Sequence, residues 1–599
     1  MSVFLPVRCG PLSSVGPTVA KGLELQLEGW RTDPKAAMQI LSSLAKTSQA
    51  GVACQVLRSM WEGQVQVDRF HFSVTISACA RACKWQLALG LLLCEMPGRK
   101  VEADTISHNA AITACEKAGQ WEIAVGLLAL MPKTRLAQSI VSCNAAISAC
   151  SKGSQWQLAL NVLMRMPHMR LLPDEISNNA AISACSTGSQ WLLALNLLSK
   201  MSKLSSRPDK ITYSAAISAC EKSCQWQLAC GLLSFMPQAR ILADTIAFSA
   251  AISACEKGAQ WQLALSLLQS MPEMSVKPDA ICCNAAISAC GKVGKWQLAL
   301  AMLSKMPYVH LRPTLISYNA VISSCEKGRQ WQLALHLLSS MSSEGKVRPD
   351  GFSYNAAISA CEKQGYWQLA LSLLQEMSEV SLAPNEISCN AAISACSKGG
   401  EWQLALGVLS CMPRMRLGAD EISFNAAVSA CEKRERWQTA LMLLRRMPEV
   451  SVAANEVSFS AAMSACEKGG QWQVAFSLLS DMPEMRAVPN DISYNAAISA
   501  AEKGGQWQLA CGLLRAIFEV GLRPSPVSFD AAVLAVSGAG PGSWPRGLQL
   551  LDAMSRAVGR CTAVSYQSLI HACDKACALE AAAALLRGLE SEQLSNIEH

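Results

Sequence analysis

Cysteine is the residue whose abundance in this sequence most suggests chemistry. The chain has 599 residues and 27 cysteines, enough for a disulfide framework or several zinc sites. However, no C-x-x-C pair occurs, and zinc sites usually begin with one. One cysteine instead recurs in each repeating unit, inside an apolar segment, at Cys79, Cys115, Cys150, Cys185, Cys220, Cys255, Cys290, Cys325, Cys361, Cys396, Cys431 and Cys466. This pattern predicts small buried hydrophobic side chains in a reducing compartment, with no metal and no cofactor.

Other catalytic chemistry has no candidate residues. The seven histidines are scattered without a Ser, Cys or Asp constellation, so no nucleophile with an adjacent base can be proposed. The Gly-Gly pairs fall where hairpin turns are expected and do not form a phosphate-binding loop. We therefore expect a protein that is not an enzyme.

The composition allows a nucleic-acid partner without arguing for one. Half of the residues are hydrophobic, 16% are charged, and the net charge is only +7. No purely apolar run reaches 18 residues, so we expect no membrane insertion. Residues 1–23 contain no Asp or Glu, which fits an organellar transit peptide and equally fits a disordered N-terminus.

The elements that must position any functional residue come from a repeat of 35 residues. Residues 351–385 form one such unit, GFSYNAAISACEKQGYWQLALSLLQEMSEVSLAPN. Periods of 20 to 50 residues indicate solenoids, propellers or arrays. The neighbouring units superimpose on it at 105–139, 140–174, 175–209, 210–244, 245–279, 280–314, 386–420, 421–455, 456–490 and 491–525, with one extra residue in 69–104 and 315–350.

Each unit contains two apolar runs at helical spacing. In one unit the first run is Val457–Lys468, the pair Gly469-Gly470 breaks it, and Trp472–Met482 forms the second. Neither run alternates with period two, so strands are not expected. Since two short helices cannot bury enough apolar surface alone, the units must stack. The sequence predicts an all-α protein, an α-solenoid of tandem helix-turn-helix repeats.

A tryptophan opens the second run of each regular unit. Stacking on RNA bases is one interpretation of this column. A wedge in the core between repeats is the other, and the fixed helical place before Q-L-A-L favours it. The column consists of Trp85, Trp121, Trp156, Trp191, Trp226, Trp261, Trp296, Trp331, Trp367, Trp402, Trp437, Trp472 and Trp507.

The departures from the repeat suggest four segments. Residues 1–33 form an N-terminal extension, and 34–68 form a degenerate capping repeat that lacks the Trp and the Cys. Residues 69–525 hold thirteen regular repeats. Residues 526–599 hold two degenerate repeats and a short tail, with a Gly/Pro-rich insertion around Pro541.

The consensus of the unit resembles the pentatricopeptide repeat family, in its P-type form. The unit opens with I-S-Y-N, as at Ile316–Asn319 and Ile492–Asn495, and closes with R-P-D, as at Arg348–Asp350. The resemblance is strong over 69–525 and weak in the flanking units. It implies a right-handed superhelix that binds single-stranded RNA at one base per repeat.

The resemblance also implies which residues contact the base. A hydrophobic second residue packs against the base, and this place holds Ile, Val or Phe throughout. The fifth and last residues bond to the base edge, and here both are small and polar. The fifth places hold Ser73, Asn109, Asn144, Asn179, Ser214, Ser249, Asn284, Asn319, Asn355, Asn390, Asn425, Ser460 and Asn495. The last places hold Asp104, Ser139, Asp174, Asp209, Asp244, Asp279, Thr314, Asp350, Asn385, Asp420, Asn455, Asn490 and Ser525.

Helix capping is the competing interpretation of both columns, because Asp and Asn beside a helix start commonly accept a backbone N–H. If the residues do contact bases, the family's pairings imply the RNA 5′-G-C-U-U-G-G-Y-U-Y-U-Y-A-C-3′, with the first regular repeat at the 5′ end. A lysine also recurs near the end of the first run, from Lys117 to Lys503. It could neutralise phosphates or complement the helix dipole, and the sequence leaves both open.

The functional expectation is sequence-specific binding of single-stranded RNA in organellar RNA processing, stabilisation, splicing or translation. The sequence shows neither the H-x-E with C-x-x-C signature of a deaminase nor room for a nuclease domain after the repeats. We expect a monomer in the chloroplast or, second, the mitochondrion, with the cytosol left open and RNA-processing or translation proteins as further partners. The alternative is a protein-binding scaffold without RNA specificity.

Overall fold

The protein is built from helices alone over the part of the chain that the structure describes. A computed structural model describes Trp30 and residues 34–597, apart from 204–206, 344–346, 541 and 559–560. The predicted all-α class is confirmed for these residues, which contain no strand. The predicted extension 1–33, except Trp30, lies outside them, as does Pro541, and the division into four segments stays a prediction.

Each repeat is a pair of helices, and the first helix begins directly after the last residue of the preceding unit. The first helices are α4 (Arg69–Arg81), α7 (Thr105–Lys117), α9 (Ile140–Lys152), α11 (Glu175–Thr187), α13 (Lys210–Lys222), α15 (Thr245–Lys257), α17 (Ala280–Lys292), α19 (Leu315–Lys327), α21 (Gly351–Gln364), α23 (Glu386–Gly399), α25 (Glu421–Lys433), α27 (Glu456–Lys468), α29 (Asp491–Lys503), α31 (Pro526–Gly538) and α33 (Ala563–Lys575).

The second helix begins at the recurring tryptophan in the regular repeats. The second helices are α5 (Trp85–Gly90), α8 (Trp121–Leu130), α10 (Trp156–Arg165), α12 (Trp191–Lys203), α14 (Trp226–Phe235), α16 (Trp261–Glu273), α18 (Trp296–Lys305), α20 (Trp331–Ser343), α22 (Trp367–Glu379), α24 (Trp402–Cys411), α26 (Trp437–Glu449), α28 (Trp472–Asp481), α30 (Trp507–Glu519), α32 (Trp544–Val558) and α34 (Leu579–Ile597). The degenerate repeat at the N-terminal end supplies α2 (Pro34–Lys46) and α3 (Ala50–Glu62). A π-helical turn (Leu91–Glu95) continues α5 into α6 (Met96–Gly98).

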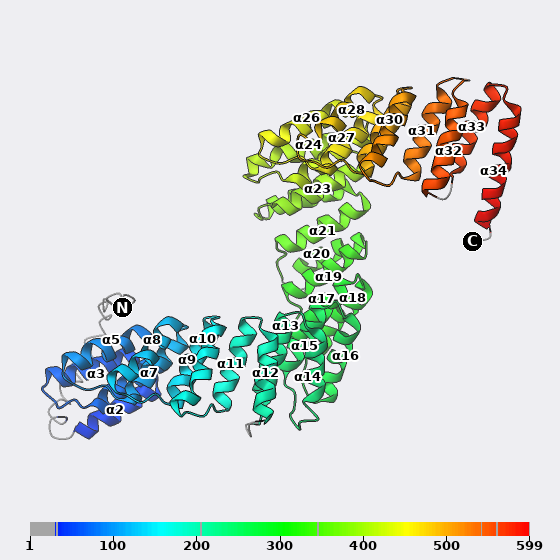
Figure 1. Ribbon diagram of the computed structural model, residues 1–599. Helices are drawn as coiled ribbons and strands as arrows, with labels where there is room; N and C mark the ends of the chain where they lie inside the picture. The colour runs from blue at the N-terminus through cyan, green and yellow to red at the C-terminus, as the bar shows by residue number, and fades with distance from the viewer. Residues whose placement is uncertain are drawn as a thin grey trace. The chain divides into compact units, whose positions relative to one another are not determined.

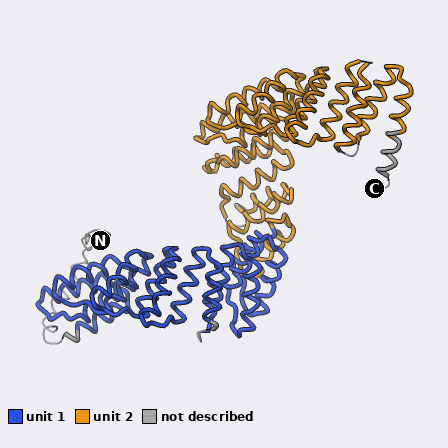
Figure 2. Tube along the Cα trace, viewed as in Figure 1, with its two compact units in different colours: residues 1–290 blue, residues 291–599 orange. Residues whose placement is uncertain are grey.

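The helix pairs stack on their neighbours in sequence, and the chain divides into two compact units, residues 1–290 and 291–599 (Figure 2). In the first unit each first helix packs on the next from α4 to α15. In the second unit the same stacking runs from α19 to α33, and the second helices lie beside them (Figure 1). Contacts only between neighbouring repeats are the mark of a solenoid.

The core combines small side chains of the first helices with Leu and Met side chains of the second helices, such as Leu409 and Met447. In α23, Ala392, Ile393 and Cys396 are fully buried, and the matching residues of the other first helices behave alike. Burial raises the pKa of the Cys396 thiol to about 11. The cysteines of the described residues are free, and no group of their His, Cys, Asp and Glu side chains could hold a metal ion. The prediction that the recurring cysteines are small buried side chains is confirmed.

The tryptophan column forms wedges between repeats, as the core interpretation predicted. The indole of Trp156 packs against Gly188, the residue that follows the first helix of the next repeat. A Cβ on Gly188 would lie 2.2 Å from Trp156 Cδ1, and the same close approach recurs at Gly153, Gly258, Gly328, Gly399, Gly469 and Gly504. We expected the pair Gly469-Gly470 to break the helix, and α27 does end at Lys468 with Gly469 as its C-cap. At the matching Gly188 the backbone is ordinary, with φ −86°, and the absence of a Cβ leaves room for the indole, whereas Ala118, Ser223 and Arg434 hold this place in other repeats.

The positive φ falls on the following residue instead. This place holds Gly470 in one repeat and the non-glycine Ser189, with φ +56°, in another. Membrane insertion was not expected, and none of the described helices is long and apolar enough to cross a membrane.

Candidate nucleic-acid interface

The last residue of each unit caps the first helix of the next one. The Asp350 carboxylate accepts the Ser353 backbone N–H at 2.9 Å, and the Ser353 hydroxyl accepts the Asp350 backbone N–H at 3.2 Å. This capping box recurs with Asp, Asn, Ser or Thr as the cap. Capping, the competing interpretation, is thus confirmed for the last places. Each Asp has a second carboxylate oxygen besides the one that accepts this N–H.

The fifth residue does not cap a helix, because it lies in the second turn. Its side chain instead bonds to the last residue of its own unit. Asn319 Nδ2 donates to Asp350 Oδ1 at 3.0 Å, and the distance from Asn to Asp is 3.0–3.2 Å in the other repeats of this type, Asn144–Asp174, Asn179–Asp209 and Asn390–Asp420. Where the last residue is Asn or Ser the distance is 3.1–3.3 Å, in Asn109–Ser139, Asn355–Asn385, Asn425–Asn455 and Asn495–Ser525. The structure therefore brings most of the predicted pairs into direct contact.

The serine repeats differ from the asparagine repeats. Ser214 Oγ reaches Asp244 Oδ1 at 3.2 Å and also donates to a helix carbonyl. The other three donate to carbonyl oxygens of their own helix, Ser73 to Phe70, Ser249 to Ile246 and Ser460 to Glu456. The shorter side chain explains this difference, since a hydroxyl on Cβ competes for the preceding turn. Asn284 lies in the first compact unit and Thr314 in the second.

An exposed apolar side chain stands beside every pair. Ile316 lies three residues before Asn319, hence on the same face of α19, and is 66% exposed. Phe352 follows Asp350 by two residues and is 75% exposed. The second places from Ile106 to Val527 are all exposed, in contrast with the buried residues on the other faces of the same helices. Single exposed apolar residues are common, but here one recurs at the same place in each regular repeat, and we call this row of side chains within each compact unit the apolar stripe.

Four of the cap carboxylates have a pKa below the usual value and are ionised at neutral pH. Partial burial by itself raises the pKa of Asp350, but hydrogen bonds from Ser353 and Asn319 outweigh it and hold that pKa below its usual value. The same balance lowers the pKa of Asp174, Asp209 and Asp420. Each of these groups is thus an acceptor only, which a base N–H could use.

The lysine column is largely engaged in ion pairs between repeats. Lys398 Nζ lies 2.9 Å from Oε1 of Glu362, the residue at the end of the preceding first helix. Equivalent pairs at 2.9–3.1 Å join Lys152–Glu116, Lys257–Glu221, Lys363–Glu326, Lys468–Glu432 and Lys503–Glu467. Neither interpretation from the sequence included this arrangement. A lysine paired in this way adds little free positive charge for a phosphate.

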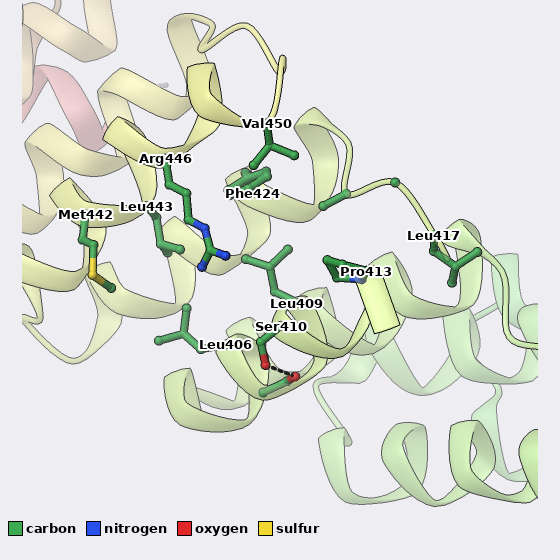
Figure 3. A pocket seen from close by; sticks show the side chains of 13 residues that line it. Leu406, Leu409, Ser410, Pro413, Leu417, Phe424, Met442, Leu443, Arg446 and Val450 are labelled. Atoms are coloured by element: carbon green, nitrogen blue, oxygen red, sulfur yellow. Dashed lines mark hydrogen bonds between the residues drawn. The ribbon is translucent and has the colours of Figure 1, made fainter. Parts of the chain in front are cut away.

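The apolar groove shown in Figure 3 lies elsewhere, between α24, α25 and α26. It has a volume of about 460 Å³, and Leu406, Leu409, Phe424 and Leu443 line it beside Arg446. None of the fifth-place or last-place residues borders it. It is a seam between adjacent helix pairs and is not part of the stripe.

Comparisons with known proteins identify the repeat. The PPR repeat matches residues 106–135, 141–171, 316–345, 387–417, 422–452 and 457–486, the pentatricopeptide repeat domain matches 266–327, and the PPR repeat family matches 349–398. A sequence search of curated proteins finds no match.

Solved structures agree on the fold. The chain resembles the pentatricopeptide repeat protein PPR10 from maize with 19% identity and a TM-score of 0.55, covering 96% of this chain and 87% of that one. It resembles PPR10 in complex with an 18-nucleotide psaJ RNA element with 18% identity and a TM-score of 0.52, covering 93% and 87%. Because family matches fall on the same stacked helix pairs that give this structural likeness, the chain is a pentatricopeptide repeat protein.

Proposed function

We propose that the protein binds single-stranded RNA along the apolar stripe, with one repeat facing one nucleotide. One observation carries this proposal: a hydrogen-bonded polar pair lies between two exposed apolar side chains, repeat after repeat, as with Asn319–Asp350 between Ile316 and Phe352. Apolar side chains can hold the face of an unstacked base, and the pair can bond to its edge. The complex of the similar PPR10 with an RNA element supports the same partner.

The chemistry of each pair favours a particular base edge. In the Asn–Asp repeats the amide has one N–H left and the second carboxylate oxygen has a lone pair left, so the pair offers a donor and an acceptor side by side. Uracil offers the complement, an acceptor O4 beside the N3–H donor. Cytosine offers the reverse, an amino donor beside N3 as acceptor. Guanine shares the pattern of uracil but is larger, and the shorter Ser of the Ser–Asp repeats leaves room for it.

This arrangement supports a protein that acts by occupying a site on an RNA. Binding would protect a transcript, remodel it or guide a processing, splicing or translation factor. We place this activity in an organelle, the chloroplast before the mitochondrion, and the acid-free residues 1–23 support that location. A fluorescent protein fused behind residues 1–33 tests it by whether it enters an organelle or stays in the cytosol.

The binding test uses the full chain and the 13-nucleotide RNA 5′-GCUUGGYUYUYAC-3′, with C at each Y. A shuffled RNA and the matching DNA are measured beside it at several salt concentrations, since phosphate contacts weaken with salt and base contacts do not. We expect tighter binding to the chosen RNA than to either control. Equal binding to every RNA would reduce the activity to a phosphate-driven groove. No binding at low salt would favour a protein-binding scaffold.

A further inference from the structure

A hydroxyl group follows every fifth-place asparagine at a fixed distance along the chain. It belongs to the third residue of the next repeat, 33 or 34 residues later, and its carriers are Ser142, Ser177, Thr212, Ser317, Ser353, Ser388, Ser423, Ser458 and Ser528. Where the fifth residue is Ser the third residue varies, since Ala247 and Cys282 follow Ser214 and Ser249. The hydroxyl therefore accompanies asparagine, and helix capping alone does not require it.

The hydroxyl donates to the asparagine oxygen in most of these repeats. Ser353 Oγ lies 2.5 Å from Asn319 Oδ1, and both Ser353 and its counterparts are fully or almost fully buried. The distance is 2.5–2.6 Å at Ser177–Asn144, Thr212–Asn179, Ser423–Asn390, Ser458–Asn425 and Ser528–Asn495. These bonds are among the shortest between side chains on the interface, so the contact is close and repeated.

Two repeats show what happens when the hydroxyl turns away. Ser142 and Ser388 donate to the backbone carbonyls of their caps, at 2.7 and 2.8 Å. In these repeats the oxygens of Asn109 and Asn355 are buried without a hydrogen-bond partner. Such an oxygen needs a donor, and a rotation of the nearby hydroxyl would supply it.

The hydroxyl and the cap together determine which way the amide faces. The carboxylate of Asp350 can only accept, so it requires the N–H side of Asn319. Ser353 Oγ accepts the backbone N–H of Asp350, and its own proton lies between Asn319 Oδ1 at 2.5 Å and Asp350 Oδ1 at 3.0 Å, of which the asparagine oxygen is the nearer. A flipped amide would set its oxygen against the carboxylate. With its oxygen turned toward this hydroxyl and one N–H toward the carboxylate, the amide presents its second N–H to a ligand.

We propose that the third-place hydroxyl is a positioning residue for base selection in the preceding repeat, which makes the fifth-place asparagine a donor only. This inference rests on the proposed RNA binding and goes beyond the fifth and last residues. A donor-only asparagine suits the O4 of uracil and opposes the amino group of cytosine. Loss of the hydroxyl removes this hold on the amide, which can then turn its oxygen toward the amino group of cytosine, so that the preference for uracil declines.

The test measures the ratio of Kd for cytosine to Kd for uracil at single nucleotides of the 13-nucleotide RNA, with the full chain. Ser353→Ala should lower this ratio about threefold to tenfold at nucleotide 8, which faces Asn319, because one hydrogen bond is lost. The ratio at nucleotide 10, which faces Asn390, should stay the same. Ser353→Thr should restore the ratio, since Thr212 makes the same bond in another repeat.

Two further variants separate positioning from folding. Ser493→Ala removes the buried third-place hydroxyl of a repeat that follows the fifth-place residue Ser460, which is not an asparagine. The ratios of Kd for cytosine to Kd for uracil at nucleotides 8 and 10 should therefore remain those of the wild type. Thr212→Val keeps the shape of the side chain and should lower the ratio at nucleotide 4, even if Ser353→Ala does not fold. Circular dichroism reports the folding of each variant.

The outcomes distinguish the two proposals. Wild-type protein that prefers uracil, with the ratio unchanged in Ser353→Ala and Thr212→Val, would overturn the positioning role and leave RNA binding intact. An equal decline in Ser493→Ala would also overturn it, because a general loosening of the caps would then be the cause. Wild-type protein that binds RNA without any preference for uracil would refute base selection and the positioning role together.

Discussion

At the scale of single residues, Asp420 and its counterparts serve the fold and the interface at once. The carboxylate accepts the Ser423 backbone N–H at 2.9 Å, which caps α25, and the amide of Asn390 at 3.0 Å. A cap of this kind contributes about 1 kcal/mol to stability. The second carboxylate oxygen, at 3.1 Å from the same amide, lies toward the pair and can accept from a ligand.

The charge on this carboxylate predicts a dependence of stability on pH. Partial burial raises the pKa of Asp420, but the hydrogen bonds from Ser423 and Asn390 outweigh it and lower the pKa from its usual 3.8. A depressed pKa in the folded state means stability that is present above pH 3.8 and is lost as the pH falls further. Asp420→Ala should therefore cost about 1 kcal/mol at pH 7. In urea unfolding the difference from wild type should shrink below about pH 4, and a constant difference would contradict the role of the charge.

The sequence predicted the positions of these residues better than it predicted the hydrogen bonds and ion pairs that they make. The 35-residue period and the family resemblance predicted the positions of Asn390 and Asp420, because each of them depends only on the number of residues between positions in the sequence. The bond from the Ser423 hydroxyl to Asn390, at 2.5 Å, depends on how two repeats stack, so it could not be predicted from either repeat alone. The pairing of Lys398 with Glu362 was missed for the same reason.

At the scale of the helix pair, a tryptophan of one repeat packs on a glycine of the next at Gly188 and its six counterparts. The first helix ends where Gly188 admits the indole of Trp156, and a Cβ there would lie 2.2 Å from Cδ1. The period predicted the tryptophan as a wedge, and only the packing shows which residue it contacts. The glycine signal was present in the sequence, but a helix-ending glycine and a glycine needed for space look the same there.

Substitution of this glycine tests the wedge. Gly188→Ala should lower the free energy of unfolding by about 1–3 kcal/mol, because the indole and the backbone must shift to admit the methyl group. Gly231→Ala is the matched control. Gly231 lies inside α14, and a Cβ added there would have no atom within 4 Å, so this change should stabilise by about 0.5–1 kcal/mol. Equal effects of the two substitutions in urea unfolding would contradict the wedge.

At the scale of the whole molecule, the properties of one repeat add along the array. Burial raises the pKa of Cys150, Cys185, Cys220 and Cys361 from about 9 to about 11, and the other first helices of the described residues contain similar thiols. Stability that comes from neutral buried thiols is complete below about pH 9. It is lost as the pH rises through about 11, because the unfolded chain releases these protons first.

The solenoid should therefore unfold at alkaline pH more readily than its stability at neutral pH suggests. We expect a constant thermal midpoint from about pH 7 to about pH 9 and a steep decline toward about pH 11. In a variant with Cys361→Ala and Cys396→Ala, the thermal midpoint should decline less between about pH 9 and about pH 11. Alanine fits the site, because Ala501 fills the same place in α29. At about pH 8 a thiol reagent should modify the exposed Cys83, Cys94, Cys224, Cys411 and Cys577 quickly and the buried column slowly. An alkaline decline that is equal in the alanine variant would refute the assignment to these thiols.

The most direct test of the central claim is a compensating exchange in one repeat. Asn319→Ser with Asp350→Asn converts the pair at nucleotide 8 from the type that favours U to the type that favours A. Binding of the full-length double variant is measured against RNAs with U or A at nucleotide 8, beside the wild type. Wild-type protein should prefer U and the double variant should prefer A, with the other nucleotides unaffected. The same preference in both proteins, or none in either, would contradict base selection by these repeats.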